Sequence, residues 1–213
     1  AQPDALDLSE GHIIDKASRQ PRMPLAELAR IVYFRGDTLP PDLPRELLQT
    51  RHFITKQYPF AFTNGVQASW LEVDPETGMI RLIKHWCVED CGRIINPLLV
   101  DEQVRGGIVQ GLGGALYEHC IYSPTGQLLN ASMADYLVPM AAEMPDIEVG
   151  HVETPTKESL LGAKGAGEAG TAGAPAAVMN AINDALKPFG ATVFAQPFTP
   201  ERILAALGKT KAR

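Results

Sequence analysis

The chain has 213 residues, of which 45% are hydrophobic, and it carries a net charge of −6. This length and mixed composition suit a packed core in one large domain or two small ones and exclude a disordered chain. The acidic balance, without a long run of Lys and Arg, argues against nucleic acid or an anionic membrane as partner, and no apolar stretch approaches the ~20 residues of a membrane span.

The first half of the chain predicts one helix and one β-hairpin. Residues 1–22 show no clear pattern and are expected to be irregular. Residues 23–34 have helical spacing, with Pro24 suited to a first turn, and the Pro- and Gly-rich residues 35–44 predict a loop. Alternating apolar residues on both sides of an Asp-Pro-Glu-Thr-Gly turn make residues 65–90 an antiparallel hairpin, expected to belong to a larger sheet.

A turn and a glycine-rich helix are predicted next. Asp90 and Asn96 are expected to bond nearby backbone groups in the turn, without a chemical role. Residues 98–122 have a helical pattern that contains five glycines: Gly106, Gly107, Gly111, Gly113 and Gly114. Each interior glycine costs a helix ~1 kcal/mol relative to alanine. We therefore expect this helix to press closely against other backbone or a ligand.

The last third of the chain predicts a short strand and two helices. Residues 123–127 read as a turn and residues 147–153 as the strand. The first helix is expected at 175–186, with Pro175 in its first turn, and the second at 200–208. Together these elements predict an α+β fold with a mixed or antiparallel sheet and packed helices.

Cysteine and histidine usage bears on compartment and metal binding. The three cysteines, Cys87, Cys91 and Cys120, are few and odd in number, which favours a reducing, cytoplasmic location with buried thiols. The N-terminal residues lack a basic region followed by an apolar one, so no signal peptide is expected. Because the five histidines are scattered, we expect no metal held by protein side chains.

The most unusual segment is "GAKGAGEAG", which surrounds the single carboxylate of Glu168 with glycines. Residues 165–170 fit the G-x-G-x-x-G pattern of dinucleotide-binding loops. The context argues against that function, because no strand directly precedes the motif, Pro175 places the helix start beyond it, and Glu168 would repel a pyrophosphate. Two other readings stay open: a flexible loop whose glutamate favours a helix dipole, and a glycine-lined pocket in which Glu168 is a general base.

Several motifs together resemble one enzyme family. These are "VDPETGMIRL", "DCGRIINPLLVDEQVRGGIVQGLGGALYE", "DYLVPMAAEMPDIEV" and "GAKGAGEAGTAGAPAAVMNAINDAL", in the order found in the molybdenum hydroxylases, the xanthine oxidase family. The resemblance extends from Arg22 to Leu207. It implies that residues 1–213 form the C-terminal molybdenum-cofactor-binding domain of that family's large subunit, as a fragment or a split subunit.

The resemblance also implies a chemistry. The cofactor would be molybdenum-molybdopterin in its cytosine dinucleotide form, with the metal held by pterin sulfurs. Glu168 falls on the family's catalytic glutamate, the base for a Mo–OH nucleophile. The enzyme would oxidise an electron-poor carbon of an N-heterocycle or an aldehyde with water-derived oxygen. Electrons would leave through [2Fe-2S] clusters and FAD on partner chains or domains.

Cofactor contacts and partners follow from the same resemblance. The stretch that lies against the pterin falls on Lys164, Gly165, Ala166 and Gly167. Gln103 falls on a glutamine that hydrogen-bonds the cofactor, although a solvent-facing helix residue is the alternative; Gln110 is better read as helix packing. The expected partners are the rest of the large subunit, an iron–sulfur subunit and a flavin subunit, without which the chain would be inactive. A non-catalytic subunit that braces a partner chain is the alternative function.

Overall fold

The structure is a computed structural model that describes residues 2–55 and 61–210. It contains two compact units, Ala1–Phe53 and Ile54–Arg213, both of which lie within the cofactor-binding domain expected at 1–213. None of the helices in the described ranges has an apolar stretch that is long enough to cross a membrane.

The first unit contains a small sheet that the sequence did not predict. Strands β1 (Leu6–Ser9), β2 (His12–Asp15) and β3 (Pro21–Pro24) pair in that order, all antiparallel, and α1 (Leu25–Phe34) follows directly. The expectation of an irregular segment over residues 1–22 was therefore wrong. Four-residue strands are too short for an alternating pattern to stand out.

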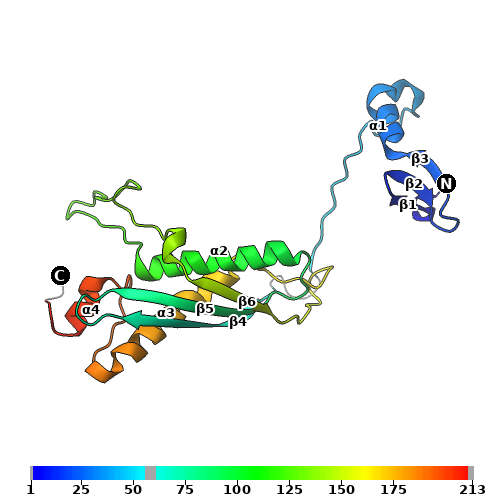
Figure 1. Cartoon of the computed structure of the whole chain (residues 1–213). Coiled ribbons are helices and arrows are strands. Elements are labelled where there is room, and N and C mark those ends of the chain that lie inside the picture. The colour runs from blue at the N-terminus through cyan, green and yellow to red at the C-terminus, as the bar shows by residue number, and fades with distance from the viewer. Residues whose placement is uncertain (1, 56–60, 211–213) are drawn as a thin grey trace. The chain divides into compact units, whose positions relative to one another are not determined.

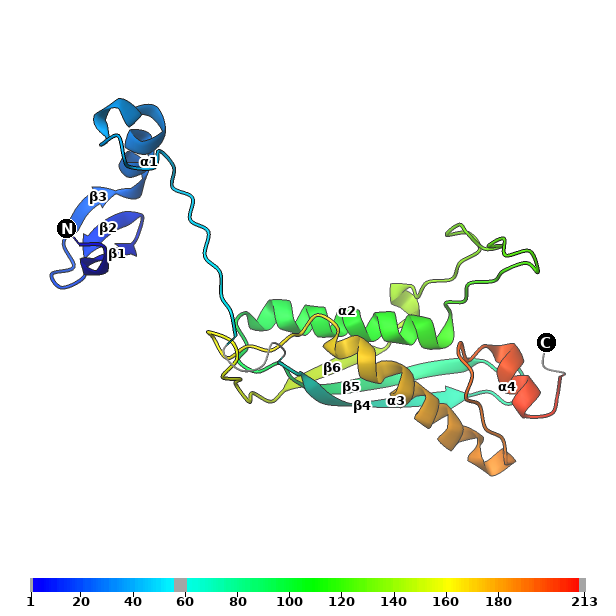
Figure 2. The same ribbon diagram turned by 180° about the vertical axis from the view of Figure 1, so that it is seen from behind.

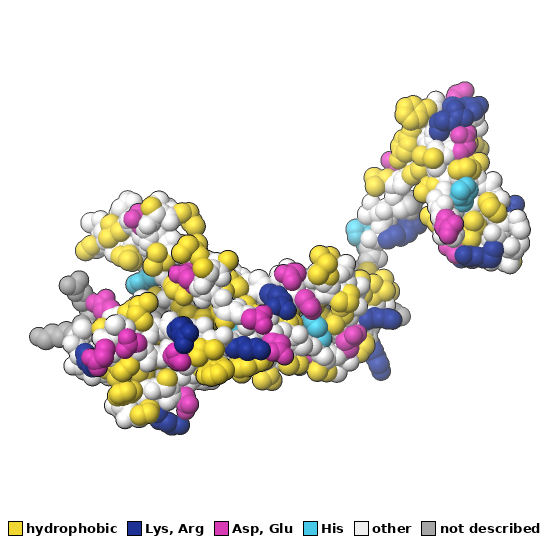
Figure 3. Space-filling model, in the orientation of Figure 1, with side chains coloured by type: hydrophobic (Ala, Val, Ile, Leu, Met, Phe, Trp, Pro, Cys, Tyr) yellow, Lys and Arg dark blue, Asp and Glu magenta, His cyan; other side chains and the backbone are white. Residues whose placement is uncertain are grey.

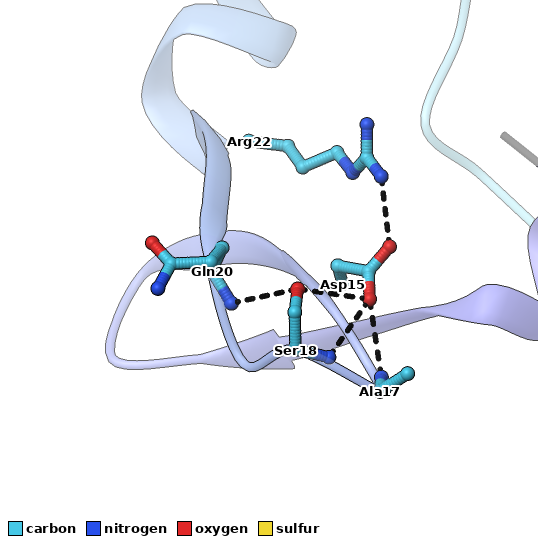
Figure 4. Close-up of polar contacts among 5 residues, drawn as sticks. All are labelled: Asp15, Ala17, Ser18, Gln20 and Arg22. Atoms are coloured by element: carbon cyan, nitrogen blue, oxygen red, sulfur yellow. Dashed lines mark hydrogen bonds and ion pairs between the residues drawn. The ribbon is translucent and has the colours of Figure 1, made fainter.

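Two turns hold this sheet together. Glu10 and Gly11 both have positive φ, as a two-residue type I′ hairpin turn requires. In the second turn Asp15 Oδ1 accepts hydrogen bonds from the backbone N–H groups of Ala17 and Ser18 at 3.1 and 3.0 Å, and Arg22 reaches Asp15 Oδ2 at 2.8 Å (Figure 4). One carboxylate thus sets the path of the chain from β2 to β3.

The helix predicted over residues 23–34 is confirmed as α1, with one difference at its start. Pro24 ends β3 and occupies the N-cap position with ψ 139°, rather than lying in the first turn. The predicted loop over 35–44 is confirmed as well, apart from one short 3-10 turn, Gly36–Thr38.

The second unit is built on a three-stranded mixed sheet (Figure 1). Strands β4 (Asn64–Val73) and β5 (Ile80–Asp90) form the predicted antiparallel hairpin, and β6 (Asp146–His151), predicted at 147–153, pairs with β5 in parallel. The order is β4-β5-β6, which confirms both the hairpin and its place in a larger sheet.

Helices α2 (Pro97–Leu116) and α3 (Ala169–Leu186) pack against each other and against one face of this sheet, and α3 runs along β4 (Figure 2). The short helix α4 (Pro200–Ala206) completes the unit, close to its predicted position. The core between these layers contains Leu71, Cys87, Val104, Ile108, Leu112, Ile147, Val178, Ile182 and Leu186. The predicted α+β class is confirmed.

The glycines of α2 explain how closely the two helices approach. A Cβ at Gly107 would lie 3.2 Å from Cα of Gly170, and one at Gly111 would lie 2.8 Å from the carbonyl oxygen of Thr171. The predicted close packing is confirmed for these glycines, and their neighbour is α3 of the same chain.

The ends of both long helices differ from the prediction. Helix α2 stops at Leu116 rather than near Tyr122, because the N–H groups of Tyr117 and Glu118 both donate to the Gly113 carbonyl and the chain turns away. Helix α3 begins at Ala169, six residues before the predicted start. One argument against dinucleotide binding, the late helix start, was therefore wrong.

A one-residue bulge in β5 decides which side chains face the helices. Trp70 pairs with Lys84 but Leu71 pairs with Leu82, so Ile83 is the extra residue. On β4 up to the bulge, the apolar residues face away from the helices: Val66 is 75% and Trp70 57% exposed, whereas Leu71, beyond it, lies in the core. The polar residues between Val66 and Trp70, Gln67 and Ser69, face the helices. They lie at the end of β4 that is close to residues 162–170, called the glycine segment below.

Between α2 and β6, residues 118–139 extend away from the helices as an arm (Figures 1 and 2). The predicted turn lies within it, with Ser123 and Gln127 joined by a backbone hydrogen bond of 2.8 Å. Hydrophobic side chains cover much of the arm's surface in Figure 3. The exposed ones include Ile121, Tyr122, Leu129, Met133 and Leu137.

Candidate cofactor and active site

A cavity of about 630 Å³ lies between the start of β4 and the glycine segment. One wall is formed by residues 61–65, Gln67 and Glu89, and the other by Gly165, Gly167 and the beginning of α3, including Glu168. A larger cavity of about 1100 Å³ lies between the arm and residues 192–206, but none of the predicted site residues lines it. The smaller cavity is therefore the candidate site.

Glu168 is the N-cap residue of α3. Its backbone carbonyl accepts the first hydrogen bonds of the helix, from the N–H groups of Thr171 at 3.2 Å and Ala172 at 3.3 Å. Its side chain makes no capping hydrogen bond and is exposed on the cavity wall. The carboxylate is therefore available to a group that enters the cavity.

Gln103, expected to hydrogen-bond the cofactor, contacts the glycine segment in this structure. Its Nε2 donates to the carbonyl oxygen of Gly167 at 2.8 Å, which fixes the backbone immediately before Glu168. Gln110 lies about two helical turns after Gln103 on α2. It accepts a hydrogen bond of 3.3 Å from Thr171 Oγ1, and that hydroxyl also lies 3.0 Å from the Gly107 carbonyl. Gln110 thus packs the helices together, as expected.

A buried ion pair anchors the same segment to the end of β5. Lys164 Nζ lies 3.1 Å from Asp90 Oδ2, with the two side chains only 10% and 7% exposed, and Lys164 also donates to Thr154 Oγ1 at 2.7 Å. Hydrogen bonds, first from Thr154 and also from the Gly92 N–H and Lys164, hold the pKa of the Asp90 carboxyl well below its usual value. The charged pair fixes the backbone that leads to Glu168.

Sequence reasoning found only part of this anchor. The turn functions of Asp90 and Asn96 are confirmed, since Asp90 Oδ1 accepts from the Gly92 N–H at 2.9 Å and Asn96 caps α2 through the Leu99 N–H at 3.3 Å. The ion pair with Lys164 was missed. Its partners are 74 positions apart in the sequence, and no local pattern connects them.

For two glycines of the segment, the described part of the chain gives no structural reason. A Cβ built at Gly165 or Gly167 would meet no atom of the described residues within 4 Å, and neither residue has a positive φ. The contrast is Gly170, whose Cβ would lie 2.2 Å from the Val104 carbonyl oxygen. The space at Gly165 and Gly167 is therefore not filled by any of the described residues.

Glu89 is a second carboxyl group on the cavity wall, and the sequence did not point to it. It is 3% exposed and lies over Gly65 of β4, where a Cβ would be 2.4 Å from its carboxyl carbon. Burial raises the pKa of Glu89, while hydrogen bonds from the Cys87 thiol and the Gln67 amide act against that rise. The cavity thus contains one buried and one exposed carboxyl group.

Beside Glu89, three polar side chains form a row on the inward face of the sheet, with His85 buried and Gln67 and Ser69 partly buried. Ser69 Oγ lies 2.9 Å from His85 Nδ1, and His85 Nε2 lies 3.1 Å from Gln67 Oε1. Gln67 Nε2 in turn donates to the Gly170 carbonyl in the first turn of α3, at 2.9 Å. Burial lowers the pKa of His85 to about 4, so the ring is neutral at neutral pH.

The low pKa of His85 makes stability depend on pH. The unfolded chain binds a proton on this ring below pH 6.5, but the folded protein does so only below about pH 4. The free energy of unfolding should therefore fall as the pH drops from 6.5 to 4, by no more than about 3 kcal/mol. We expect the assembled protein's melting temperature to decrease less over this range in His85→Gln. An equal decrease in melting temperature for the wild type and His85→Gln would show that His85 is not the cause, because the other titratable groups are the same in both proteins.

Comparisons with known proteins place the chain in one family. The model of the molybdopterin cofactor-binding domain matches residues 1–145. The chain is 40% identical to the nicotine 6-hydroxylase large subunit of Paenarthrobacter nicotinovorans, over 93% of this chain and 24% of that protein. It is 31% identical to the carbon monoxide dehydrogenase large chain of Hydrogenophaga pseudoflava, over 70% of this chain and 18% of that protein.

The fold agrees with these matches. The crystal structure of quinoline 2-oxidoreductase from Pseudomonas putida 86 superposes with a TM-score of 0.75 at 36% identity, covering 98% of this chain and 26% of that one. The chain thus spans about a quarter of the length of such relatives. It belongs to the molybdopterin cofactor-binding domain family, and corresponds to part of the large subunit of the molybdenum hydroxylases, the xanthine oxidase family.

Proposed function

We propose that this chain is the part of a molybdenum hydroxylase that carries the catalytic base and one wall of the cofactor site. The enzyme would oxidise an electron-poor carbon, in an N-heterocycle or an aldehyde. An N-heterocycle is favoured by the names of two relatives, nicotine 6-hydroxylase and quinoline 2-oxidoreductase.

The observation that carries the proposal is the open space beside the only carboxylate of the glycine segment. Gly165 and Gly167 flank a cavity that contains Glu168, and nothing in the described chain occupies the volume that their side chains would take. A pterin could lie directly against this backbone, so the residues present fit the cofactor that the family implies.

Each residue of the site then has a task. Backbone groups of Lys164, Gly165, Ala166 and Gly167 would hold the pterin, while the Lys164 side chain stays paired with Asp90. Gln103 donates to the Gly167 carbonyl, and its Oε1 would face the cofactor. When bound, the cofactor supplies the two-electron chemistry and the oxygen, derived from water, that enters the product. Glu168 would accept the proton on its carboxylate, as a general base does.

Other parts of the enzyme complete the reaction in this proposal. The rest of the large subunit would cover the cofactor and choose the substrate, and [2Fe-2S] and flavin groups on partner chains or domains would remove the electrons. The cofactor would carry the cytosine dinucleotide form. The exposed apolar arm and the outward face of β4 provide surface for the missing part of the subunit.

Analysis of the purified complex tests this proposal. The chain assembled with its partners should contain about one molybdenum per chain, and turnover in ¹⁸O-labelled water should place the label in the product. The chain produced alone should contain no molybdenum and show no turnover. A stable complex without molybdenum would instead support the alternative of a bracing, non-catalytic subunit.

A further inference from the structure

Two glutamine amides hold the backbone on either side of Glu168. Gln103 of α2 donates to the carbonyl of Gly167, the residue before it, at 2.8 Å. Gln67 of β4 donates to the carbonyl of Gly170, two residues after it, at 2.9 Å. We propose that Gln67 is a positioning residue for Glu168, acting through the Gly170 carbonyl; this inference rests on the proposed function of Glu168 as the base.

The orientation of the Gln67 side chain is fully determined by its neighbours. The Gly170 carbonyl can only accept, so the Gln67 atom that faces it must be the amide nitrogen. Gln67 Oε1 therefore faces His85 Nε2, which must carry the ring proton. His85 Nδ1 is then an acceptor, and the Ser69 hydroxyl donates to it. Ser69 and His85 thus hold the Gln67 amide in a single orientation.

Packing on α3 reinforces this contact. A Cβ at Gly173 would lie 2.9 Å from the Gln67 amide carbon, so this glycine lets the Gln67 side chain lie flat against the first turns of the helix. On another side of the helix, Gly170 lies directly against the backbone of α2 at Val104. The first turn of α3 is therefore held between β4 and α2, with Glu168 at its beginning.

A positioned base requires such support. A misplacement of about 1 Å at a catalytic group lowers a reaction rate by about 100-fold. The glycines around Glu168 give the backbone wide conformational freedom, which the two glutamine contacts remove. Without Gln67 the first turn of α3 would lose its hydrogen bond to β4, and the carboxylate would sample more positions.

The variant Gln67→Met keeps the length of the side chain and removes its hydrogen bonds. In the assembled enzyme we expect kcat to fall about 10- to 100-fold, with KM within about twofold and the molybdenum content unchanged. Hydrogen exchange of peptides covering residues 167–174 should accelerate. The matched control is Gln20→Met, which removes an exposed glutamine amide from the turn between β2 and β3, outside the arm and the cavity, and should change none of these.

The outcomes separate this inference from the proposed function. Wild-type kcat and wild-type exchange in Gln67→Met would overturn the positioning role. If that variant fails to assemble, Ser69→Ala removes only the donor to His85 and should lower kcat about fivefold, as loss of one hydrogen bond would; an unchanged kcat there would overturn it. A wild-type complex without hydroxylase activity would refute the function of Glu168, while the exchange comparison would still decide whether Gln67 orders α3.

Discussion

Replacing Glu168 by glutamine in the assembled enzyme is expected to abolish nearly all turnover. Glutamine keeps the shape of the side chain, and the backbone contacts of Gly167 and Gly170 stay intact, so the fold and the cavity should be preserved. A general base contributes about 10²- to 10⁴-fold to a rate. We expect kcat to fall by about 10⁴-fold or more, because the attacking oxygen would also keep its proton.

The measurement is steady-state turnover per molybdenum in the reconstituted complex. Glu201→Gln, on the first turn of α4, serves as the control, because Glu201 lies outside the cavity with Glu168. Molybdenum content should be equal in the wild type and both variants. Turnover by Glu168→Gln within a few-fold of the wild type would show that the base is another group, and Glu89, on the opposite wall of the same cavity, would be the next candidate.

Gly170→Ala is expected to have the largest effect on the fold. The added Cβ would lie 2.2 Å from the Val104 carbonyl oxygen and 2.8 Å from the Ile108 nitrogen. Both are backbone atoms of a buried helix and cannot move aside as a flexible side chain can. Overpacking a core costs about 1–3 kcal/mol, occasionally more. We expect the upper end here, seen as a melting temperature lower by about 10 °C or as loss of soluble complex.

Gly165→Ala is the matched comparison, with the same substitution five residues earlier. Because no described atom lies within 4 Å of the new Cβ, the melting temperature of the protein should change little. The molybdenum content should fall, since the methyl group would take space that the pterin needs. Equal destabilisation by both substitutions would contradict the distinction between glycines required for packing and glycines that leave room for the cofactor.

The sequence predicted the elements whose patterns are local. The hairpin over 65–90 has strands of 10 and 11 residues and a clear turn, so its alternating pattern could be recognised. Close packing was correctly indicated by Gly107 and Gly111 of α2, but not by Gly106 and Gly114, where a Cβ would meet no described atom within 4 Å. The start of α3 was misplaced because Pro175 normally marks a first turn. Here it lies in the helix interior, where it cannot donate to the Thr171 carbonyl, and Gly111 of α2 lies against that carbonyl instead.

The polar half of the site could not be predicted in the same way. Gln67, Ser69 and His85 are the polar members of an alternating pattern, and such residues usually face water. Nothing in one sequence shows which face of the hairpin the helices cover. The function of Glu168 came from motif resemblance, whereas the two glutamines and the Asp90–Lys164 pair that surround it depend on contacts between segments that are far apart in the chain.

The extra residue Ile83 has a consequence for how this protein can change during evolution. Before it, Ile80 and Leu82 of β5 point into the core; after it, His85 and Glu89 point to the same side. Deleting a single residue there would turn one half of the strand over and move either the core or the site to the opposite face. Among homologous sequences, insertions and deletions should therefore accumulate in the arm between residues 118 and 139, while the length of β5 should stay constant.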